Sequence, residues 1–262
     1  MADLDAHKPP LRPLLNQTIR RRGIYLLPNL FTTAALFAGF YAIVQGMNQQ
    51  FELAAIAIVV AMVLDGLDGR VARLTRTQSA FGAEYDSLSD MVSFGVAPAL
   101  VMYEWALKDL GRIGWVAAFV YCVGAALRLA RFNTNLGVVD KRFFQGLPSP
   151  AAAALVAGFV WLANDNKIPV SEYGMPWLAT LLTVYAGITM VSNVPFYSFK
   201  DINLRRSVPF AVILLIALAF VLISVDPPII GFLLFVAYGV SGYVYWIWRR
   251  RPRTRAAPPP PP

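Results

Sequence analysis

Four aspartates lie close together in a chain that is otherwise mostly apolar: Asp65, Asp68, Asp86 and Asp90. The first two are three residues apart and the last two are four apart. On helices, both spacings place the side chains on one face. Two such pairs facing each other would repel unless cations neutralised them. Because hard oxygen ligands favour Mg²⁺ or Mn²⁺, the pattern predicts a divalent-metal site that handles phosphates.

The residues around the aspartates fit the binding of a phosphate. Gly69 and Gly82 remove side chains where a bulky phosphate must approach the backbone. Arg73 lies one helical turn after Gly69, where it can pair with a phosphate, and Ser79 offers a hydroxyl. A non-catalytic, ion-paired helix turn in a transporter is the structural alternative. It leaves the number and spacing of these residues unexplained.

Few other side chains could act as a base. The only histidine, His7, lies in a polar N-terminal segment, and the only cysteine, Cys122, lies in an apolar run. One cysteine can form neither a disulfide framework nor a thiolate metal site. We therefore expect a carboxylate to serve as the base.

The composition is that of an all-α, polytopic membrane protein. Hydrophobic residues make up 57% of the 262 residues and charged residues only 15%, where a soluble domain has about a quarter. The apolar residues form long runs, most of them sufficient for a bilayer core of about 30 Å. We predict about eight membrane-spanning helices, at residues 26–47, 52–74, 86–106, 112–132, 149–164, 175–196, 208–225 and 228–248.

The distribution of basic residues predicts the orientation. With eight spans, twenty lysines and arginines fall on the side of the two termini and three on the other. Both termini are then cytoplasmic, and the aspartates lie at the cytoplasmic ends of the second and third spans. The net charge of +8 is explained by these flanking residues, so we expect no nucleic acid partner. We divide the chain into a basic segment (1–22), a membrane domain (23–248) and a disordered, proline-rich tail (249–262).

Residues 65–90 resemble the full signature of the CDP-alcohol phosphotransferase family, D-x2-D-G-x2-A-R-x8-G-x3-D-x3-D. The resemblance implies an integral membrane enzyme that transfers a substituted phosphate group from a CDP-linked donor to an alcohol and releases CMP. It also implies two divalent cations, Mg²⁺ or Mn²⁺, and a homodimer.

The resemblance assigns a role to each aspartate. Asp65 and Asp86 would bridge the two metals, Asp68 would bind the first, and Asp90 would bind the second and act as general base. The residues that would contact the CDP-linked donor are Asn29, Thr32, Gly69, Arg73, Ser79 and Gly82.

Other segments resemble one branch of this family, the integral-membrane phosphatidylserine synthases of bacteria and archaea. These segments are Phe81–Ala99, Leu127–Asn133, Phe144–Pro150 and Val191–Phe196. The branch implies CDP-diacylglycerol and L-serine as substrates, in a bacterial inner membrane with the site facing the cytoplasm. Relatives that use glycerol 3-phosphate or inositol phosphate are the alternative, and an ion-coupled transporter is a weaker one of another class.

Two arginines near the end of the predicted fourth span are candidates for the serine carboxylate. Arg128 and Arg131 lie about one turn apart on the cytoplasmic side. They could equally be orientation charges that extend to the membrane surface. Acidic acceptors would need the same arginines, so this feature does not identify the alcohol.

Overall fold

The fold is nearly all helical in the computed structural model of the chain. The structure describes residues 11–75, 77, 79–134, 143–170, 174–198, 214, 218, 221 and 224–250, with the side chains of α1 from residue 27 on. Most of the predicted span at 208–225 lies outside these residues, as do the first ten residues and the tail after Arg250.

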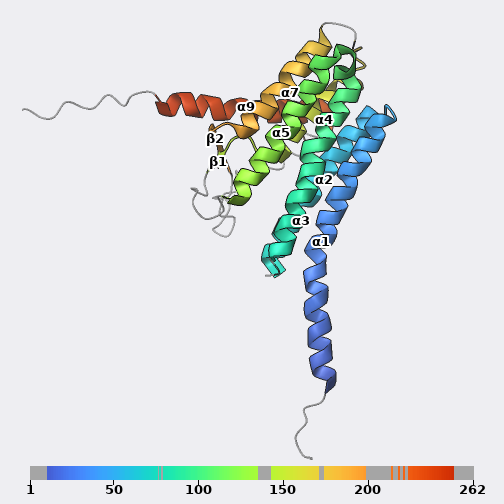
Figure 1. Cartoon of the computed structure of the whole chain (residues 1–262), viewed down its shortest axis with the longest axis vertical. Coiled ribbons are helices and arrows are strands. Elements are labelled where there is room, and N and C mark those ends of the chain that lie inside the picture. The colour runs from blue at the N-terminus through green and yellow to red at the C-terminus, as the bar shows by residue number, and fades with distance from the viewer. Residues whose placement is uncertain are drawn as a thin grey trace, which may run out of the picture.

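The first three helices form an antiparallel unit (Figure 1). Helix α1 (Leu11–Met47) turns at Gln49 into α2 (Phe51–Thr75), the pair with the most extensive mutual packing. The third predicted span is one unbroken run of helical turns. It comprises α3 (Ala80–Asp90), the π-helical η1 (Met91–Val96), α4 (Ala97–Met102) and the π-helical η2 (Tyr103–Leu107), followed by the short η3 (Lys108–Leu110).

The second half of the bundle surrounds a central helix. Helix α6 (Ser149–Asp165) packs against α2, α7 (Met175–Val191) and α9 (Pro227–Arg250), while α5 (Arg112–Thr134) packs against α7. Small residues allow these helices to approach closely, because a Cβ at Gly124 of α5 would overlap the backbone of Gly187 in α7.

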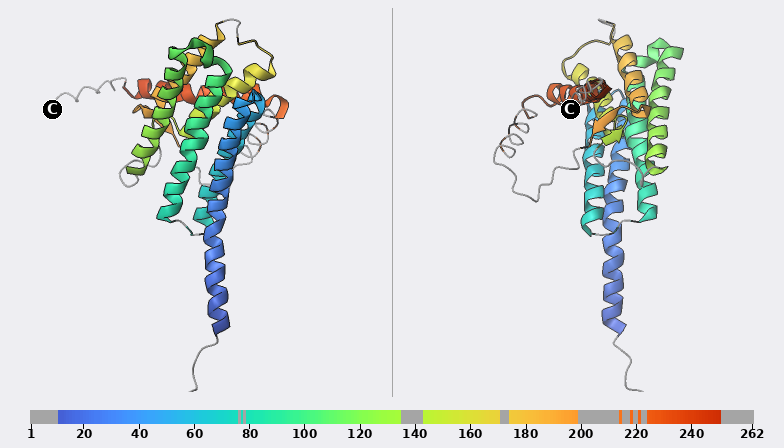
Figure 2. Two further views of the ribbon diagram at one scale, coloured as in Figure 1. Left: turned by 45° about the vertical axis from the view of Figure 1, so that its right-hand side comes forward. Right: turned by 90° about the vertical axis from the view of Figure 1, so that its left-hand side faces the viewer.

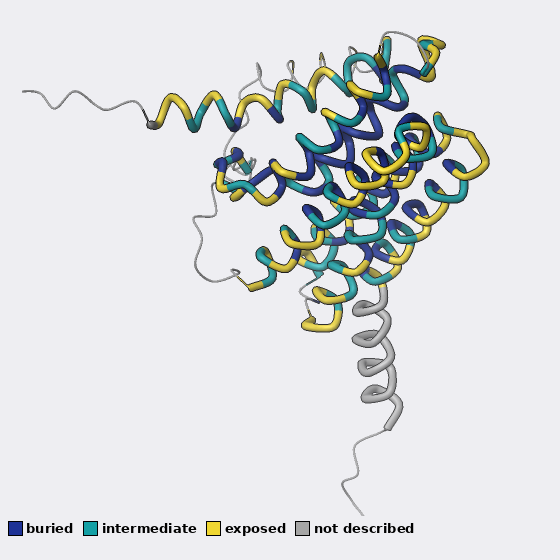
Figure 3. Tube along the Cα trace, turned by 45° about the horizontal axis from the view of Figure 1, so that its top comes forward, coloured by how far each residue is buried: buried dark blue, intermediate teal, exposed yellow. Residues whose placement is uncertain are grey.

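Burial follows the expected pattern for helices in lipid (Figure 3). The core is rich in alanine, and large apolar side chains such as Phe37, Phe40 and Phe119 lie on the outside, more than half exposed. An outer surface of this kind suits contact with acyl chains.

Among the described residues, three helices are long and apolar enough to cross a membrane. They are Leu27–Met47 of α1, Arg112–Thr134, and Pro227–Arg249 of α9. Helix α7 is apolar but shorter. Helix α9 runs crosswise to α1 and α5 (Figures 1 and 2). The structure therefore supports a helical membrane protein, whereas the eight spans and their orientation stay predictions.

A small antiparallel sheet was not predicted. Strand β1 (Phe143–Gln145) pairs with β2 (Pro195–Tyr197), with Phe144 opposite Phe196. The predicted helix at 175–196 is thus too long, since α7 ends at Val191, Ser192 is extended, and Pro195 begins a strand. Gly146 follows β1 with a φ of 78°, and its N–H donates to the Val194 carbonyl at 2.9 Å.

Candidate active site

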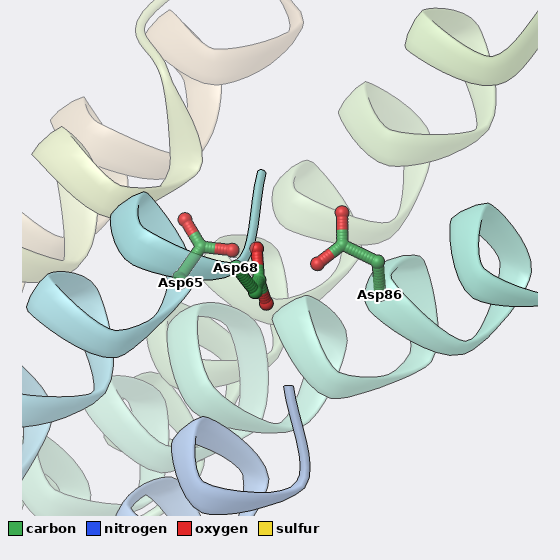
Figure 4. Close-up of side chains that lie close together, drawn as sticks. All are labelled: Asp65, Asp68 and Asp86. Atoms are coloured by element: carbon green, nitrogen blue, oxygen red, sulfur yellow. The ribbon is translucent and has the colours of Figure 1, made fainter. Parts of the chain in front are cut away.

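Helices α2 and α3 bring three of the four aspartates together. One carboxylate oxygen from each of Asp65, Asp68 and Asp86 lies within 4.8 Å of the other two. The side chains extend from the two helices into a common space (Figure 4). Asp68 is the most deeply placed, with 5% of its surface exposed. The end of α2 and the α3 helix therefore bring these three carboxylates together, as the spacing of the aspartates predicts.

The fourth aspartate joins this cluster through Asp65. The carboxyl groups of Asp90 and Asp65 lie within hydrogen-bonding reach of each other. The guanidinium of Arg128 lies near enough to interact electrostatically with both. The structure thus places all four carboxylates and one cation at the same end of the bundle.

The cluster fits a hard divalent cation. Oδ1 of Asp86 is buried and has no hydrogen-bond partner among the described residues. No lysine or arginine that the structure describes forms a salt bridge with any of the four carboxylates. Four carboxylates packed this closely, with Arg128 as the one nearby protein cation among the described residues, need further positive charge from outside the chain. An all-oxygen donor set of this kind suits Mg²⁺ or Mn²⁺.

A cavity of about 300 Å³ lies beside the carboxylates, between α1, α2 and α3. Asp68 and Asp86 form part of its wall. Five of the six residues predicted to contact the CDP-linked donor also line it: Asn29, Thr32, Gly69, Ser79 and Gly82. We call this cavity the donor pocket. Its volume and the polar side chains that project into it are suited to a nucleotide or phosphate group.

The sixth predicted contact, Arg73, does not line the donor pocket. It is exposed near the end of α2, and its Nη2 lies 4.0 Å from the point that a Cβ at Gly69 would occupy. The guanidinium is therefore close to Gly69 without filling the space beside it.

The start of α3 shapes one wall of the donor pocket. Ser79 precedes the helix in an extended conformation, and its hydroxyl accepts a hydrogen bond from the Gly82 N–H at 3.0 Å. This is the usual capping arrangement for a serine at a helix start. A Cβ at Gly82 would lie 3.1 Å from Oγ of Ser79 and 3.5 Å from Oδ1 of Asn29. Gly82 therefore keeps space open at this wall.

The two arginines of α5 have different surroundings. Nη1 of Arg128 donates to Oγ of Ser149 at 2.6 Å, and Ser149 is fully buried at the start of α6. Nη1 of Arg131 donates to Oδ1 of Asn193 at 3.0 Å. Its Nη2 lies 3.2 Å and 3.3 Å from the carbonyl oxygens of Ser192 and Met190. The sequence carries no signal that distinguishes the two arginines or that marks Ser149 and Asn193 as their partners.

A larger apolar groove of about 470 Å³ lies between α5 and α7. None of the four aspartates lines it, and its wall is formed almost entirely by side chains such as Phe119, Val123 and Leu127. Its lining contains one hydroxyl, that of Ser192, and no charged side chain, so the groove lacks a metal-binding or phosphate-neutralising group.

Comparison with known proteins identifies the family. Residues 25–191 match the model of the CDP-alcohol phosphatidyltransferase family. The chain belongs to this family. The match includes all four aspartates and the whole donor pocket, and it ends at the last residue of α7. The resemblance inferred from the aspartate spacing is therefore confirmed.

Individual members of the family are similar over most of the chain. A Helicobacter pylori (strain J99) protein named CDP-diacylglycerol–serine O-phosphatidyltransferase is 39% identical over 226 residues, covering 86% of this chain and 92% of the relative. Proteins with the same name from Mycobacterium tuberculosis (strain H37Rv) and Methanocaldococcus jannaschii are each 34% identical. The former alignment covers 83% of this chain and 78% of the relative, and the latter 86% and 96%.

Proposed function

We propose that this chain transfers the phosphatidyl group of CDP-diacylglycerol to the hydroxyl of L-serine, giving phosphatidylserine and CMP. The main support is the convergence of four carboxylates from α2 and α3 beside the donor pocket. Three relatives that cover most of the chain carry the name of this activity. Membership of a phosphatidyltransferase family favours this function over ion-coupled transport.

The four aspartates would hold two divalent cations, Mg²⁺ or Mn²⁺. Asp65 and Asp86 would be shared by both ions, with Asp68 completing one site and Asp90 the other. Bound ions would supply positive charge to the phosphoryl oxygens as negative charge builds there. Oδ1 of Asp86 has no hydrogen-bond partner among the residues that the structure describes, and this observation most favours its role as a ligand.

The donor pocket would hold the cytidine diphosphate part of the donor. Asn29, Thr32, Ser79 and Gly82 line it, Gly69 leaves room for the pyrophosphate, and Arg73 would approach it from the rim. The acyl chains would remain in lipid, because the pocket lies between helices of a membrane bundle.

Asp90 would start the transfer by accepting the proton of the serine hydroxyl. The serine oxygen then bonds to the phosphorus that carries diacylglycerol. The bond from that phosphorus to the oxygen it shares with CMP breaks, and CMP leaves with the electron pair. This is direct displacement. A route through a covalent intermediate would instead let the protein exchange labelled CMP into CDP-diacylglycerol without serine.

Arg128 is the better placed of the two arginines to bind the serine carboxylate. Its guanidinium lies near Asp65 and Asp90, and only its bond to Ser149 occupies it among the described residues. A guanidinium can form a bidentate pair with a carboxylate while one further donor stays bound to protein. Arg131 would act beside it by fixing the end of α5 to α7.

The proposed setting is a bacterial inner membrane, with the site and both termini on the cytoplasmic side. The count of twenty basic residues against three supports this orientation for a bundle of eight spans. We also propose a homodimer, because the family resemblance implies one.

One assay tests the substrate assignment. The purified protein is incubated with CDP-diacylglycerol, Mn²⁺ and either serine, glycerol 3-phosphate or inositol phosphate, and the lipid product is identified. We expect phosphatidylserine and an equal amount of CMP with serine alone. Product from another alcohol would reject serine as the acceptor, and no CMP with any alcohol would reject the transferase function.

A further inference from the structure

Two buried serines connect the helix run of Asp86 and Asp90 to α1. Oγ of Ser89 donates to the Thr32 carbonyl at 3.1 Å, and Oγ of Ser93 donates to the Ala35 carbonyl at 3.0 Å. Their exposed fractions are 2% and 1%. Ser89 directly precedes Asp90 and follows Asp86 by one helical turn. A displacement at Ser89 would therefore move both carboxylates.

Thr32 also contacts the other carboxylate-bearing helix. Its hydroxyl donates to Oδ2 of Asp68 at 2.9 Å, while its carbonyl accepts the bond from Ser89. One residue of α1 thus binds α2 through its side chain and α3 through its backbone. We call the two hydrogen bonds that join Asp68, Thr32 and Ser89 the Thr32 link.

The surrounding packing fixes α1 against this region. A Cβ at Gly39 would overlap the side chain and backbone of Ser93, so the two helices meet with no space for a larger residue. The α-helical turns of α3 give way to the π-helical η1 directly after Asp90. Such π-helical turns often occur at functional sites. Relative motion of α1 and α3 is therefore restricted just where the carboxylates must be held.

We propose that Ser89 is a positioning residue for the metal site, because its bond to Thr32 sets the distance between Asp68 on α2 and the Asp86 and Asp90 pair on α3. The proposal deepens the proposed function and rests on it. Four carboxylates repel one another before any cation arrives, so something in the protein must hold them together. Residues that orient metal ligands in this way typically alter metal affinity or activity by roughly 10-fold to 100-fold when they are replaced.

Mn²⁺ binding without substrate tests this role. The full-length protein in lipid nanodiscs is titrated with Mn²⁺, and free Mn²⁺ is measured by electron paramagnetic resonance. We expect Ser89→Ala to weaken Mn²⁺ binding about tenfold or more. Ser93→Ala is the matched control, because it removes the same kind of bond one turn along α1. Ala35, its partner, has no polar side chain to contact an aspartate, so the affinity of this variant should stay within about twofold of the unchanged protein.

A conservative variant separates the hydrogen bond from the packing. Ser89→Thr retains a hydroxyl donor and should recover most of the Mn²⁺ affinity that Ser89→Ala loses. An unchanged affinity in Ser89→Ala, or an equal loss in Ser93→Ala at matched melting temperature, would overturn the proposal. Because this titration contains no CDP-diacylglycerol or serine, its outcome is distinct from a failure of the wild-type protein to release CMP.

Discussion

The acidic cluster of α2 and α3 and the arginine pair of α5 differ in how far the protein itself satisfies their polar groups. Asp86 has a buried oxygen with no partner among the described residues, and no salt bridge neutralises the cluster there. Arg131, in contrast, binds one side-chain oxygen and several carbonyls of the chain. A site with unsatisfied buried groups is built for a ligand, whereas a site with satisfied groups is built for structure. Arg128 is intermediate, because one hydrogen bond to Ser149 satisfies only part of its guanidinium.

The largest effect is expected from Asp86→Asn. The substitution removes one negative charge and places an amide where an ion would bind, so several kcal/mol of charge stabilisation should be lost. We expect CMP release to fall by about a thousandfold or more, since each 1.36 kcal/mol is a factor of about ten. Radiolabelled CMP release measures this, with size-exclusion profile and melting temperature as controls for folding. Activity near that of the wild type would show that Asp86 is not a required metal ligand.

Asp90→Asn should cost less, because it removes the proposed base and one metal ligand while leaving the shared ligands in place. We expect turnover to fall by about a hundredfold or more, in the range typical of general bases. The same CMP assay measures it. Full activity in a folded Asp90→Asn protein would contradict the assignment of Asp90 as the base.

The arginine pair gives the sharpest test of the comparison. Arg128→Ala should raise the KM for serine by about tenfold or more, with a smaller change in the KM for CDP-diacylglycerol, because it removes a charge-assisted bond to the acceptor. Arg131→Ala should instead lower the stability by about 1 kcal/mol, because it removes the guanidinium from the partly buried carbonyls of Met190 and Ser192. Initial rates at varied serine and thermal melts of both variants measure the two effects. An unchanged KM for serine in Arg128→Ala would mean that Arg128 does not bind the acceptor and serves only as an orientation charge.

Local patterns in the sequence are sufficient to predict that the acidic side chains cluster. A spacing of three residues on one helix explains why Asp65 and Asp68 lie together, and the short connection between α2 and α3 explains why Asp86 lies opposite them. The apolar run predicted at 52–74 coincides with α2, and that at 149–164 with α6. These features depend on neighbours along one helix or on two helices joined by a short connection, where the sequence pattern is most informative.

Contacts between distant segments could not be predicted in this way. Three of the partners of Arg131, namely Met190, Ser192 and Asn193, lie 59 to 62 residues along the chain, beyond any helical spacing. The pairing of β1 with β2 joins residues 50 to 54 positions apart, and each strand has only three residues. The Ser89 bond to Thr32 spans 57 residues, and nothing in the sequence around Ser89 distinguishes it from Ser87. These features depend on how the helices pack.

The smallest effect concerns the wall of the donor pocket. Gly82→Ala places a methyl group 3.1 Å from Oγ of Ser79 and 3.5 Å from Oδ1 of Asn29, so at least one of these side chains must shift. The added methyl group also takes space that the donor would occupy, so a loss of about 1 kcal/mol of donor binding should raise the KM for CDP-diacylglycerol by about fivefold. The KM for serine should change less, because the acceptor would bind on the other side of the carboxylates.

Stability separates this effect from misfolding. Alanine favours a helix interior over glycine by about 1 kcal/mol, so the melting temperature of Gly82→Ala should not fall far. Gly231→Ala in α9 is the matched control, because a Cβ there has no atom of the described residues within 4 Å and Gly231 does not line the donor pocket. Initial rates at varied CDP-diacylglycerol measure both variants. Equal KM values in the two would mean that the space beside Gly82 is not used by the donor, and the pocket would then lose its assignment as the CDP site.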